Sequence, residues 1–526
     1  MNCLMDSKTQ DQKSIGVAVA ATSAIYIYLL VFAFPFTPIF SETDQLIFVY
    51  EASRLLHGDV MYRDFFQFTF PGTQTYYHVV LSLFGERYWI LPFTVVILGS
   101  VLTFLCLKLS ESVISGSLRF VPSFIFLFFG LRWFGLDGSH RMFSPILMLM
   151  AVFFLLSKVN RKRLIAAGVC CALASFFTQQ RGVVTLTAIA VYLVLDAFMT
   201  PRGKAQALYD IAVMSGTFLM TIGLLCLYFI LSAGPTDFFY ATFTYPAKYY
   251  KYVEANSYSV FVSDLIKTAS APGISGTLMF LGSVFYSVIL PFAVLTAFAV
   301  FAIRRKNVSW DDWRGPMLLS LLAAFSFFTT TGPNALRFFQ VGIPAIIVFC
   351  WLLSRIGMAA KKEQRLTLLS LTLLALIGLS QIYRMQTHWD FSIVETRSGK
   401  LAFISAEQAR FYQDLSDRTQ GGEFVYQAVQ PYVYFPLGVR NPTRFSQIWQ
   451  TDYTRPEQVA EAVADLEKKR PRYIVWDNNY NLSPETRKPD DHTGPMAEMV
   501  TQKYFPNGPV YEMDGRRIQL WKLRSP

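Results

Sequence analysis

Basic side chains beside long apolar segments are the first candidates for chemistry in this sequence. Arg181 and Arg337 each lie at the edge of such a segment, and His140 and Arg141 precede another. A charge at such a position is costly and usually serves a site or a pathway. The planar guanidinium of arginine can also donate two parallel hydrogen bonds to a phosphate. These four residues are candidate phosphate ligands; the alternatives are snorkelling or ion pairing for the arginines and a structural role for His140.

Three aspartates near the same segments could take part in acid–base chemistry. They are Asp44, Asp64 and Asp137. A positioned carboxylate can accept the proton of an attacking hydroxyl, an effect of about 10²–10⁴-fold on rate. Each aspartate also has a structural alternative. Asp44 could be a helix N-cap or a solvated loop acid, Asp64 could pair with Arg63 in a turn, and Asp137 could form a tight turn with Gly138.

The composition indicates a membrane protein with a sizeable soluble part. The chain has 526 residues, of which 53% are hydrophobic, 16% aromatic and only 16% charged. A soluble domain carries roughly 25% charged residues, so a cytosolic enzyme, a disordered chain and a fibre are all excluded. The mean hydropathy of +0.35 is nevertheless too low for a chain made of spans alone.

Eleven apolar segments are long enough, or nearly long enough, to cross a membrane, which takes about 20 residues. We predict spans near 15–36, 88–109, 116–134, 142–157, 163–179, 183–200, 208–233, 276–303, 316–331, 335–354 and 366–384. The sequence therefore predicts an α-helical polytopic membrane module over 1–384, followed by a separate domain over 385–526.

Basic residues in the loops orient these spans. Lysine and arginine gather in every second loop: Lys158, Arg161, Lys162 and Arg163; Arg202 and Lys204; Arg304, Arg305, Lys306 and Arg314; Arg355, Lys361, Lys362 and Arg365. Such loops face the cytoplasm, and the net charge of +11 fits that arrangement better than nucleic-acid binding. We expect a multi-pass protein of the cytoplasmic (inner) membrane, with its N-terminus inside and its C-terminal domain outside.

The external C-terminal domain reads as α/β. Short apolar runs predict strands at Phe424–Val429, Tyr473–Val475 and Ile518–Trp521, and Pro456 is expected to open an amphipathic helix. The external loop over Tyr240–Tyr252 is rich in tyrosine and lysine. It could line a sugar or lipid-phosphate groove, or form an aromatic belt at the membrane surface.

The first external loop, residues 38–87, has an ordered set of features. Ser41-Glu42-Thr43-Asp44-Gln45-Leu46 places an acid at the membrane exit, and Leu46–Leu56 has the pattern of an amphipathic interfacial helix. Gly58-Asp59-Val60-Met61-Tyr62-Arg63-Asp64 follows, then Phe70-Pro71-Gly72, and a short helical run ends at Phe84-Gly85.

This loop resembles that of the GT-C membrane glycosyltransferases, and the many-span body with an external C-terminal domain resembles their bacterial branch of aminoarabinose or mannosyl transferase type. The resemblance implies a hexosyl- or pentosyltransferase that takes its sugar from a polyprenyl-phosphate donor at the outer face. The acceptor would be an unidentified glycan, lipid or protein, and the anomeric centre would be inverted.

The resemblance also suggests roles for individual residues. Asp44 would be the catalytic carboxylate. It would act as the base or position the acceptor. The usual Asp-Glu pair is Asp44-Gln45 here, so no acid pair supports a divalent metal, and no other cofactor is indicated. Ser144-Pro145 stands where many members have a second acid, so either Asp137 substitutes for it or the second acid is absent.

Two other functions remain open. A lipid-carrier flippase or transporter would use a similar set of spans, but such proteins often contain internal repeats, and none is visible here. A polysaccharide polymerase would use a lipid-linked oligosaccharide as donor. The sequence contains no P-loop and no dinucleotide-binding fingerprint, which fits a lipid-linked rather than a nucleotide-linked donor.

Overall fold

The computed structural model describes residues 2–157, 159–250, 256–304, 309–356, 359–387, 390–451, 453–481, 487–513 and 515–524. Lys158, Arg305 and Lys306 of the basic loops, and Lys251 and Tyr252 of the tyrosine-rich loop, lie outside these ranges. Contacts divide the chain into two compact units. Unit 1 comprises Met1–Leu30, Thr94–Cys226 and Glu254–Met385, and unit 2 comprises Val31–Phe93, Leu227–Val253 and Gln386–Pro526.

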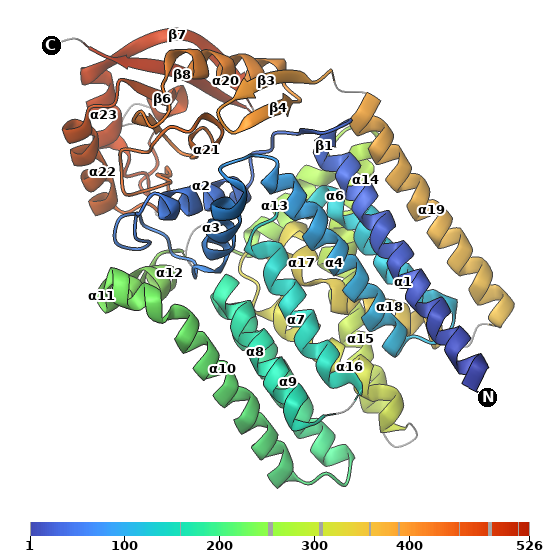
Figure 1. Cartoon of the computed structure of the whole chain (residues 1–526). Coiled ribbons are helices and arrows are strands. Elements are labelled where there is room, and N and C mark those ends of the chain that lie inside the picture. Colours follow the sequence, from blue (N-terminus) through green and yellow to red (C-terminus); the bar gives the residue numbers. More distant parts are fainter. Residues whose placement is uncertain are drawn as a thin grey trace. The chain divides into compact units, whose positions relative to one another are not determined.

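Unit 1 is built from apolar helices (Figure 1). Its elements are α1 (Asn2–Val31), α4 (Ile90–Val113), η1 (Ser117–Phe120), α5 (Val121–Phe124), η2 (Ile125–Gly130), α6 (Leu131–Phe134), α7 (His140–Ser157), α8 (Arg161–Phe177), α9 (Gln179–Met199), α10 (Lys204–Ala233), α13 (Ser259–Ala269), α14 (Gly273–Val284), η6 (Phe285–Ile289), α15 (Leu290–Arg304), α16 (Trp310–Phe328), α17 (Ala335–Val341), α18 (Ile343–Ser354) and α19 (Ala360–Thr387).

Helix occupies each of the eleven predicted spans. Among the described residues, seven helical stretches are long and apolar enough to cross a membrane, and an eighth is obtained if α17 and α18 form one span bent by 77°. The helices α7, α8 and α16 fill the other three ranges and are shorter or carry charged ends. The prediction of a multi-pass helical membrane protein is confirmed.

A buried ion network fastens one end of α9 to its neighbours in unit 1. The Asp196 carboxylate is 3% exposed and lies 3.6 Å from Arg202 and 3.5 Å from Arg314. It also accepts a hydrogen bond of 2.8 Å from the Trp310 indole N–H. Arg202 pairs in addition with Asp210 on α10. Basic residues of two predicted cytoplasmic loops therefore also hold three helices together.

Unit 2 combines the first external loop with the C-terminal region. Its elements are β1 (Phe32–Ala33), β2 (Thr37–Pro38), α2 (Asp44–Leu56), α3 (Gly72–Phe84), α11 (Pro235–Phe239), η3 (Tyr240–Thr244), α12 (Tyr245–Lys248), β3 (Ser392–Thr396), β4 (Gly399–Phe403), α20 (Ala406–Arg418), β5 (Val425–Gln427), α21 (Tyr434–Leu437), α22 (Pro456–Lys469), β6 (Tyr473–Asp477), η7 (Asn478–Asn481), α23 (Gly494–Lys503), β7 (Tyr504–Met513) and β8 (Arg516–Leu523).

A four-stranded sheet in the order β5-β6-β8-β7 forms the centre of the C-terminal region. The β5–β6 pair is parallel, whereas β6–β8 and β8–β7 are antiparallel. The three predicted strands and the helix that begins at Pro456 are all present. The predicted α/β character is therefore confirmed.

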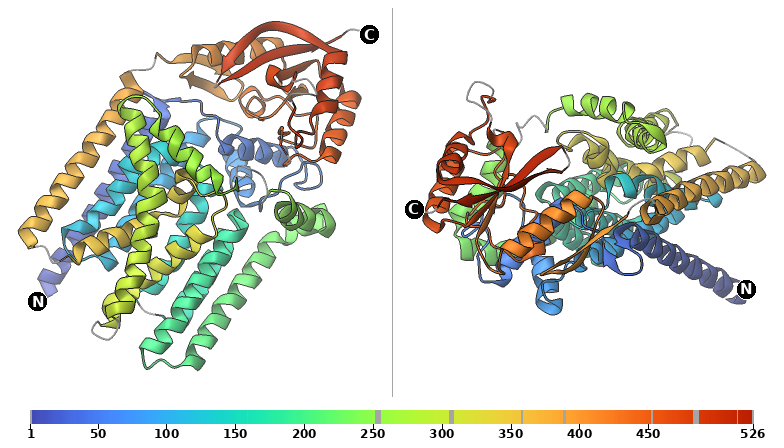
Figure 2. Two further views of the ribbon diagram at one scale, coloured as in Figure 1. Left: turned by 180° about the vertical axis from the view of Figure 1, so that it is seen from behind. Right: turned by 90° about the horizontal axis from the view of Figure 1, so that it is seen from above.

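The sheet is covered on both faces because side chains alternate along each strand. One face packs against α22 and α23, and the other packs against α20 (Figure 2). The face that packs against α20 continues into α2 and α3, whose Leu46, Val49, Tyr77 and Leu81 belong to the same apolar cluster. The first external loop and the C-terminal region therefore share one core, and α2 is buried along Gln45–Ala52. The predicted interfacial helix exists, but this stretch of it packs against protein.

Candidate active site

Asp44 begins α2 in unit 2. Thr43 is the N-cap residue, with extended backbone angles of φ −125° and ψ 167°, so Asp44 is the first helical residue and the N-cap alternative is wrong. The N-terminus of a helix favours a negative charge because its free N–H groups carry partial positive charge. The half-buried Asp44 carboxylate is therefore held at the end of a rigid element.

The residue after it, Gln45, is a buried hydrogen-bond donor. Its Nε2 atom donates to the Tyr77 hydroxyl at 2.6 Å and to the Leu91 carbonyl oxygen at 2.8 Å. An ionised glutamate could only accept hydrogen bonds, so it could not satisfy the Leu91 carbonyl. The amide at position 45 ties α2 to α3 and to the start of α4, and it does not supply a second carboxylate beside Asp44.

An aromatic cluster in unit 2 includes a tyrosine that lies near Asp44. Phe68, Tyr245, Tyr250 and Tyr453 form it, with ring centroids 4.9 Å apart for Phe68–Tyr250 and 5.7 Å apart for Phe68–Tyr453. Asp44 lies close enough to Tyr453 to act on its hydroxyl electrostatically. Tyr245 is only 1% exposed, so this tyrosine of the loop packs inside unit 2.

Glu51 was not singled out by the sequence, yet it is the most unusual carboxyl group of unit 2. It is completely buried on α2, two turns after Asp44. It accepts hydrogen bonds from Gln67 Nε2 at 3.0 and 2.9 Å and from Gln74 Nε2 at 2.8 Å. Burial, partly offset by these hydrogen bonds, raises the pKa of Glu51 to about 7. The only signal in the sequence is a lone acid within the apolar stretch Leu46–Ala52.

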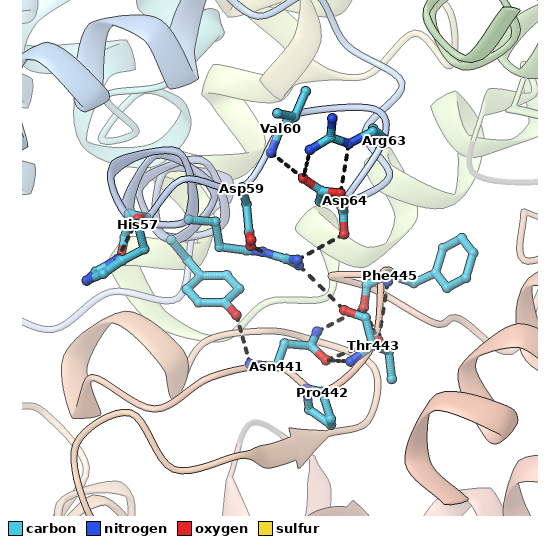
Figure 3. Close-up of polar contacts among 12 residues, drawn as sticks. His57, Asp59, Val60, Arg63, Asp64, Asn441, Pro442, Thr443 and Phe445 are labelled. Atoms are coloured by element: carbon cyan, nitrogen blue, oxygen red, sulfur yellow. Dashed lines mark hydrogen bonds and ion pairs between the residues drawn. The ribbon is translucent and has the colours of Figure 1, made fainter. Parts of the chain in front are cut away.

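Asp64 has the structural role that the sequence left open as its alternative. Its carboxylate forms a bidentate pair with the Arg63 guanidinium, at 3.0 and 2.8 Å, and accepts a 2.7 Å hydrogen bond from the Val60 N–H. The hydrogen bonds and charge of Arg63 hold the pKa of Asp64 below its usual value. Figure 3 shows Asp64 in contact with Arg63 and Val60 of the same turn.

In unit 1, Asp137 positions Arg141. Its carboxylate accepts hydrogen bonds from Arg141 Nη1 at 3.2 Å and from the Ser139 hydroxyl at 3.0 Å. Only 10% of the Asp137 side chain is exposed. The turn before α7 is therefore fixed by an ion pair, and it presents His140 and Arg141 at the start of that helix.

Arg181 stands beside these residues. Arg141 and Arg181 both lie close enough to His140 to act on it electrostatically. Arg181 donates to the amide oxygen of Gln340 on α17, while its Nη1 atom is buried without a hydrogen-bond partner among the described residues. A buried guanidinium donor without a partner is costly, so this cluster of His140, Arg141 and Arg181, named here the basic cluster, is suited to an anion.

Close packing of α8 against α9 explains the glycine that follows Arg181. A Cβ atom on Gly182 would lie 1.9 Å from the Cys171 carbonyl oxygen. Only glycine allows the two helices to approach this closely at the start of α9. Arg181 is thereby held at a defined position by a tight helical hairpin.

Arg337 is held separately by neutral oxygen atoms. Its guanidinium donates to Asn256 Oδ1 at 2.8 Å and to the carbonyl oxygens of Thr331 and Gly332. The Asn334 side chain caps α17 by accepting from the Arg337 N–H at 2.9 Å. Because α17 also carries Gln340, the partner of Arg181, this short helix links Arg337 to the basic cluster within unit 1.

The candidate residues thus form two groups, one in each unit. Asp44 and Asp64 belong to unit 2, whereas Asp137, His140, Arg141, Arg181 and Arg337 belong to unit 1. Among the described residues, no group of three or more His, Cys, Asp and Glu side chains could hold a metal ion. The Asp44-Gln45 pair does not fit one either, because Gln45 donates its amide to other groups.

This chain has the fold of the GT-C glycosyltransferases. That fold combines a body of apolar helices with a unit in which a loop helix shares its core with an α/β region. ArnT from Cupriavidus metallidurans, solved with undecaprenyl phosphate, is similar over 98% of both chains, with a TM-score of 0.58 and 12% identity.

The oligosaccharyltransferase AglB from Archaeoglobus fulgidus, solved with an inhibitory peptide and dolichol-phosphate, is similar over 95% of this chain and 74% of its own, with a TM-score of 0.52 and 12% identity. The same enzyme solved with zinc and sulfate gives a TM-score of 0.53 at 13% identity, over 95% and 72% of the two chains. No protein-family model and no curated protein matches the sequence.

Proposed function

We propose that this protein is an integral-membrane glycosyltransferase that moves a sugar from a polyprenyl-phosphate donor to an acceptor at the outer face of the cytoplasmic membrane. The observation that carries the proposal is the shared fold with ArnT over nearly the whole of both chains, because ArnT was solved with a polyprenyl phosphate. The buried Nη1 donor of Arg181, which has no hydrogen-bond partner among the described residues, also suits a phosphate.

In the proposed reaction, the acceptor hydroxyl attacks the anomeric carbon and the bond from that carbon to the phosphate oxygen breaks. The Asp44 carboxylate accepts the hydroxyl proton, and the phosphate leaves with the electron pair of the broken bond. Such a phosphate needs charge stabilisation rather than a general acid, and Arg181 and Arg141 would supply it. A single displacement of this kind inverts the anomeric centre.

The remaining candidate residues have supporting roles in this proposal. Asp137 positions Arg141 through their ion pair, Arg337 adds positive charge to the surroundings of the donor phosphate, and His140 adds a hydrogen-bonding ring beside it. If the acceptor is itself a phosphate, no base is required and Asp44 orients it. In this proposal the basic loops face the cytoplasm, so that the N-terminus lies inside and the C-terminal region outside.

The proposal is tested by deleting the gene and analysing surface glycans and lipids by mass spectrometry. We expect one sugar to disappear from one class of surface molecule, with its polyprenyl-phosphate form accumulating. The wild-type gene and the variant Asp417→Asn, an exposed acid of α20, should restore the sugar, whereas Asp44→Asn should not. An unchanged glycan and lipid profile in the deletion strain would overturn the proposal.

A further inference from the structure

Unit 2 contains a polar cavity that the proposed reaction does not use. Its volume is about 450 Å³, within the range of small-molecule sites. The second half of α2, the turn after it and Glu86 form one wall, and residues from 397 to 469 of the C-terminal region form the rest. Figure 3 shows the two sides facing each other, with His57 and Asp59 opposite Asn441.

On the α2 wall the charge of Arg54 is neutralised by Asp59. Arg54 Nε lies 2.7 Å from the Asp59 carboxylate, and His57 lies 3.9 Å from Glu86. Arg54 also donates to the carbonyl oxygens of Asp64 and Thr443, at 3.0 and 3.5 Å. The contacts of Arg54 therefore hold residues 38–87 against the C-terminal region.

The opposite wall has positive charge in excess. Arg440 and Lys469 line it, and neither is paired with a carboxylate in the described ranges. The Arg440 side chain makes no hydrogen bond or ion pair with any described residue, and Lys469 contacts the Phe424 ring at 5.4 Å and the Pro442 carbonyl oxygen. A third cation, Arg397, donates to backbone carbonyls of Leu437, Ser416 and Thr419.

Two buried tyrosines pack behind the surface of the cavity. The rings of Tyr50 and Tyr434 stack with their centroids 4.7 Å apart. Each hydroxyl oxygen already accepts a hydrogen bond of 2.8 Å from a backbone N–H, that of Asn441 for Tyr50 and that of Gln427 for Tyr434. Neither hydroxyl proton has an acceptor among the described residues. At 4% and 0% exposure the two side chains present almost no surface to the cavity, whose accessible aromatic ring is that of the half-buried Phe424.

The cavity thus offers the donors and positive charge of its basic side chains beside the half-buried Phe424 ring. A ligand that fits must be rich in acceptors and negatively charged, and must have a face able to pack on an aromatic surface. A sugar ring bearing a phosphate or a carboxylate has all three properties. We propose that this cavity binds an anionic saccharide, with its acidic group near Arg440 and Lys469 and its ring near Phe424.

This site is separate from Asp44. Both lie on α2, but Asp44 opens the helix and Arg54 follows ten residues later, a rise of about 15 Å along the axis. The cavity would therefore bind a saccharide that is not at the reacting bond. This inference stands independently of the proposed transfer reaction.

The test is calorimetric titration of the full-length protein in detergent with glucose 6-phosphate, glucuronate, glucose and inorganic phosphate. We expect both anionic sugars to bind, and glucose and inorganic phosphate to bind at least about tenfold more weakly. Equal affinity for glucose would show that charge is not recognised, and equal affinity for inorganic phosphate would show that the sugar is not. Either result would overturn the proposal.

Variants locate the site. The double variant R440E/K469A should lose at least about tenfold in affinity for glucose 6-phosphate, whereas Lys468→Ala, the neighbouring exposed lysine outside the cavity, should bind as the wild type does. Because Arg440 and Lys469 are exposed, the double variant should fold like the wild type. Thermal unfolding checks this. Asp44→Asn should keep full affinity even if it abolishes sugar transfer. Wild-type affinity in R440E/K469A would refute this location.

Discussion

Replacing Glu51 by glutamine should change the pH dependence of stability. The Glu51 carboxyl is completely buried, and its pKa is raised from 4.5 to about 7. A glutamine at this position is uncharged at every pH. Its amide N–H could also donate to Gln74 Oε1, a buried atom without a hydrogen-bond partner in the described part of the chain. The variant should therefore fold.

The size of the effect follows from the pKa shift. A carboxyl group whose pKa is higher in the folded state stabilises the fold fully at pH values below its unfolded pKa, and this contribution is lost as the pH rises through the folded pKa. For Glu51 the loss extends from about pH 4.5 to about pH 7. With about 1.4 kcal/mol for each pH unit, ionised Glu51 costs about 3 kcal/mol above pH 7.

The assay is thermal unfolding of the detergent-solubilised protein between pH 5 and pH 9. The Tm of the wild type should fall relative to that of Glu51→Gln by roughly 6 to 12 °C over this range, if unit 2 behaves as a domain of ordinary size. The matched control is Glu395→Gln, whose carboxyl is 67% exposed, and its pH dependence should follow the wild type. If Glu51→Gln also follows the wild type, the described burial of Glu51 is refuted.

Three further substitutions test the two units separately. Gln45→Glu should destabilise the protein by about 1–3 kcal/mol, because the Leu91 carbonyl loses its buried donor, and an unchanged Tm would contradict that role. Asp196→Ala should cost about 1–3 kcal/mol in thermal unfolding, because the buried Trp310 indole N–H loses its acceptor while Arg202 and Arg314 keep Asp210 and Asp311 as partners; an unchanged Tm would speak against the network. Arg181→Ala should lower sugar transfer about 10²-fold without lowering the Tm, whereas the exposed Arg161→Ala should transfer normally. Equal transfer by both variants would remove Arg181 from the site.

The sequence predicted local structure well because local patterns determine it. Apolar segments of span length became helices, and Pro456 opens α22 because proline fits the first turn of a helix. The strands β5, β6 and β8 followed from short apolar runs. The sequence did not reveal that α2 and α3 share a core with the C-terminal sheet, because that packing joins residues more than 300 positions apart.

The sequence indicated which residue types belong to the candidate site, but it did not indicate how these residues are arranged in space. Arg181 and Arg141 stood out as charges beside apolar runs, and the structure brings them together with His140. The contact of Arg181 with Gln340 spans 159 positions and leaves no local pattern. Glu51 was missed because its burial depends on Gln67 and Gln74, which lie on other elements. Long-range packing decides such cases.

The central claim is that Asp44 serves transfer of a sugar from a lipid-linked donor. It is tested most directly by incubating membranes that contain the wild type, Asp44→Asn or Asp417→Asn with radiolabelled polyprenyl-phosphate sugars, and measuring the label that leaves the carrier lipid. We predict that Asp44→Asn is at least about 10²-fold slower than the wild type at equal protein level, and that Asp417→Asn is not. A wild-type rate in Asp44→Asn would contradict the claim.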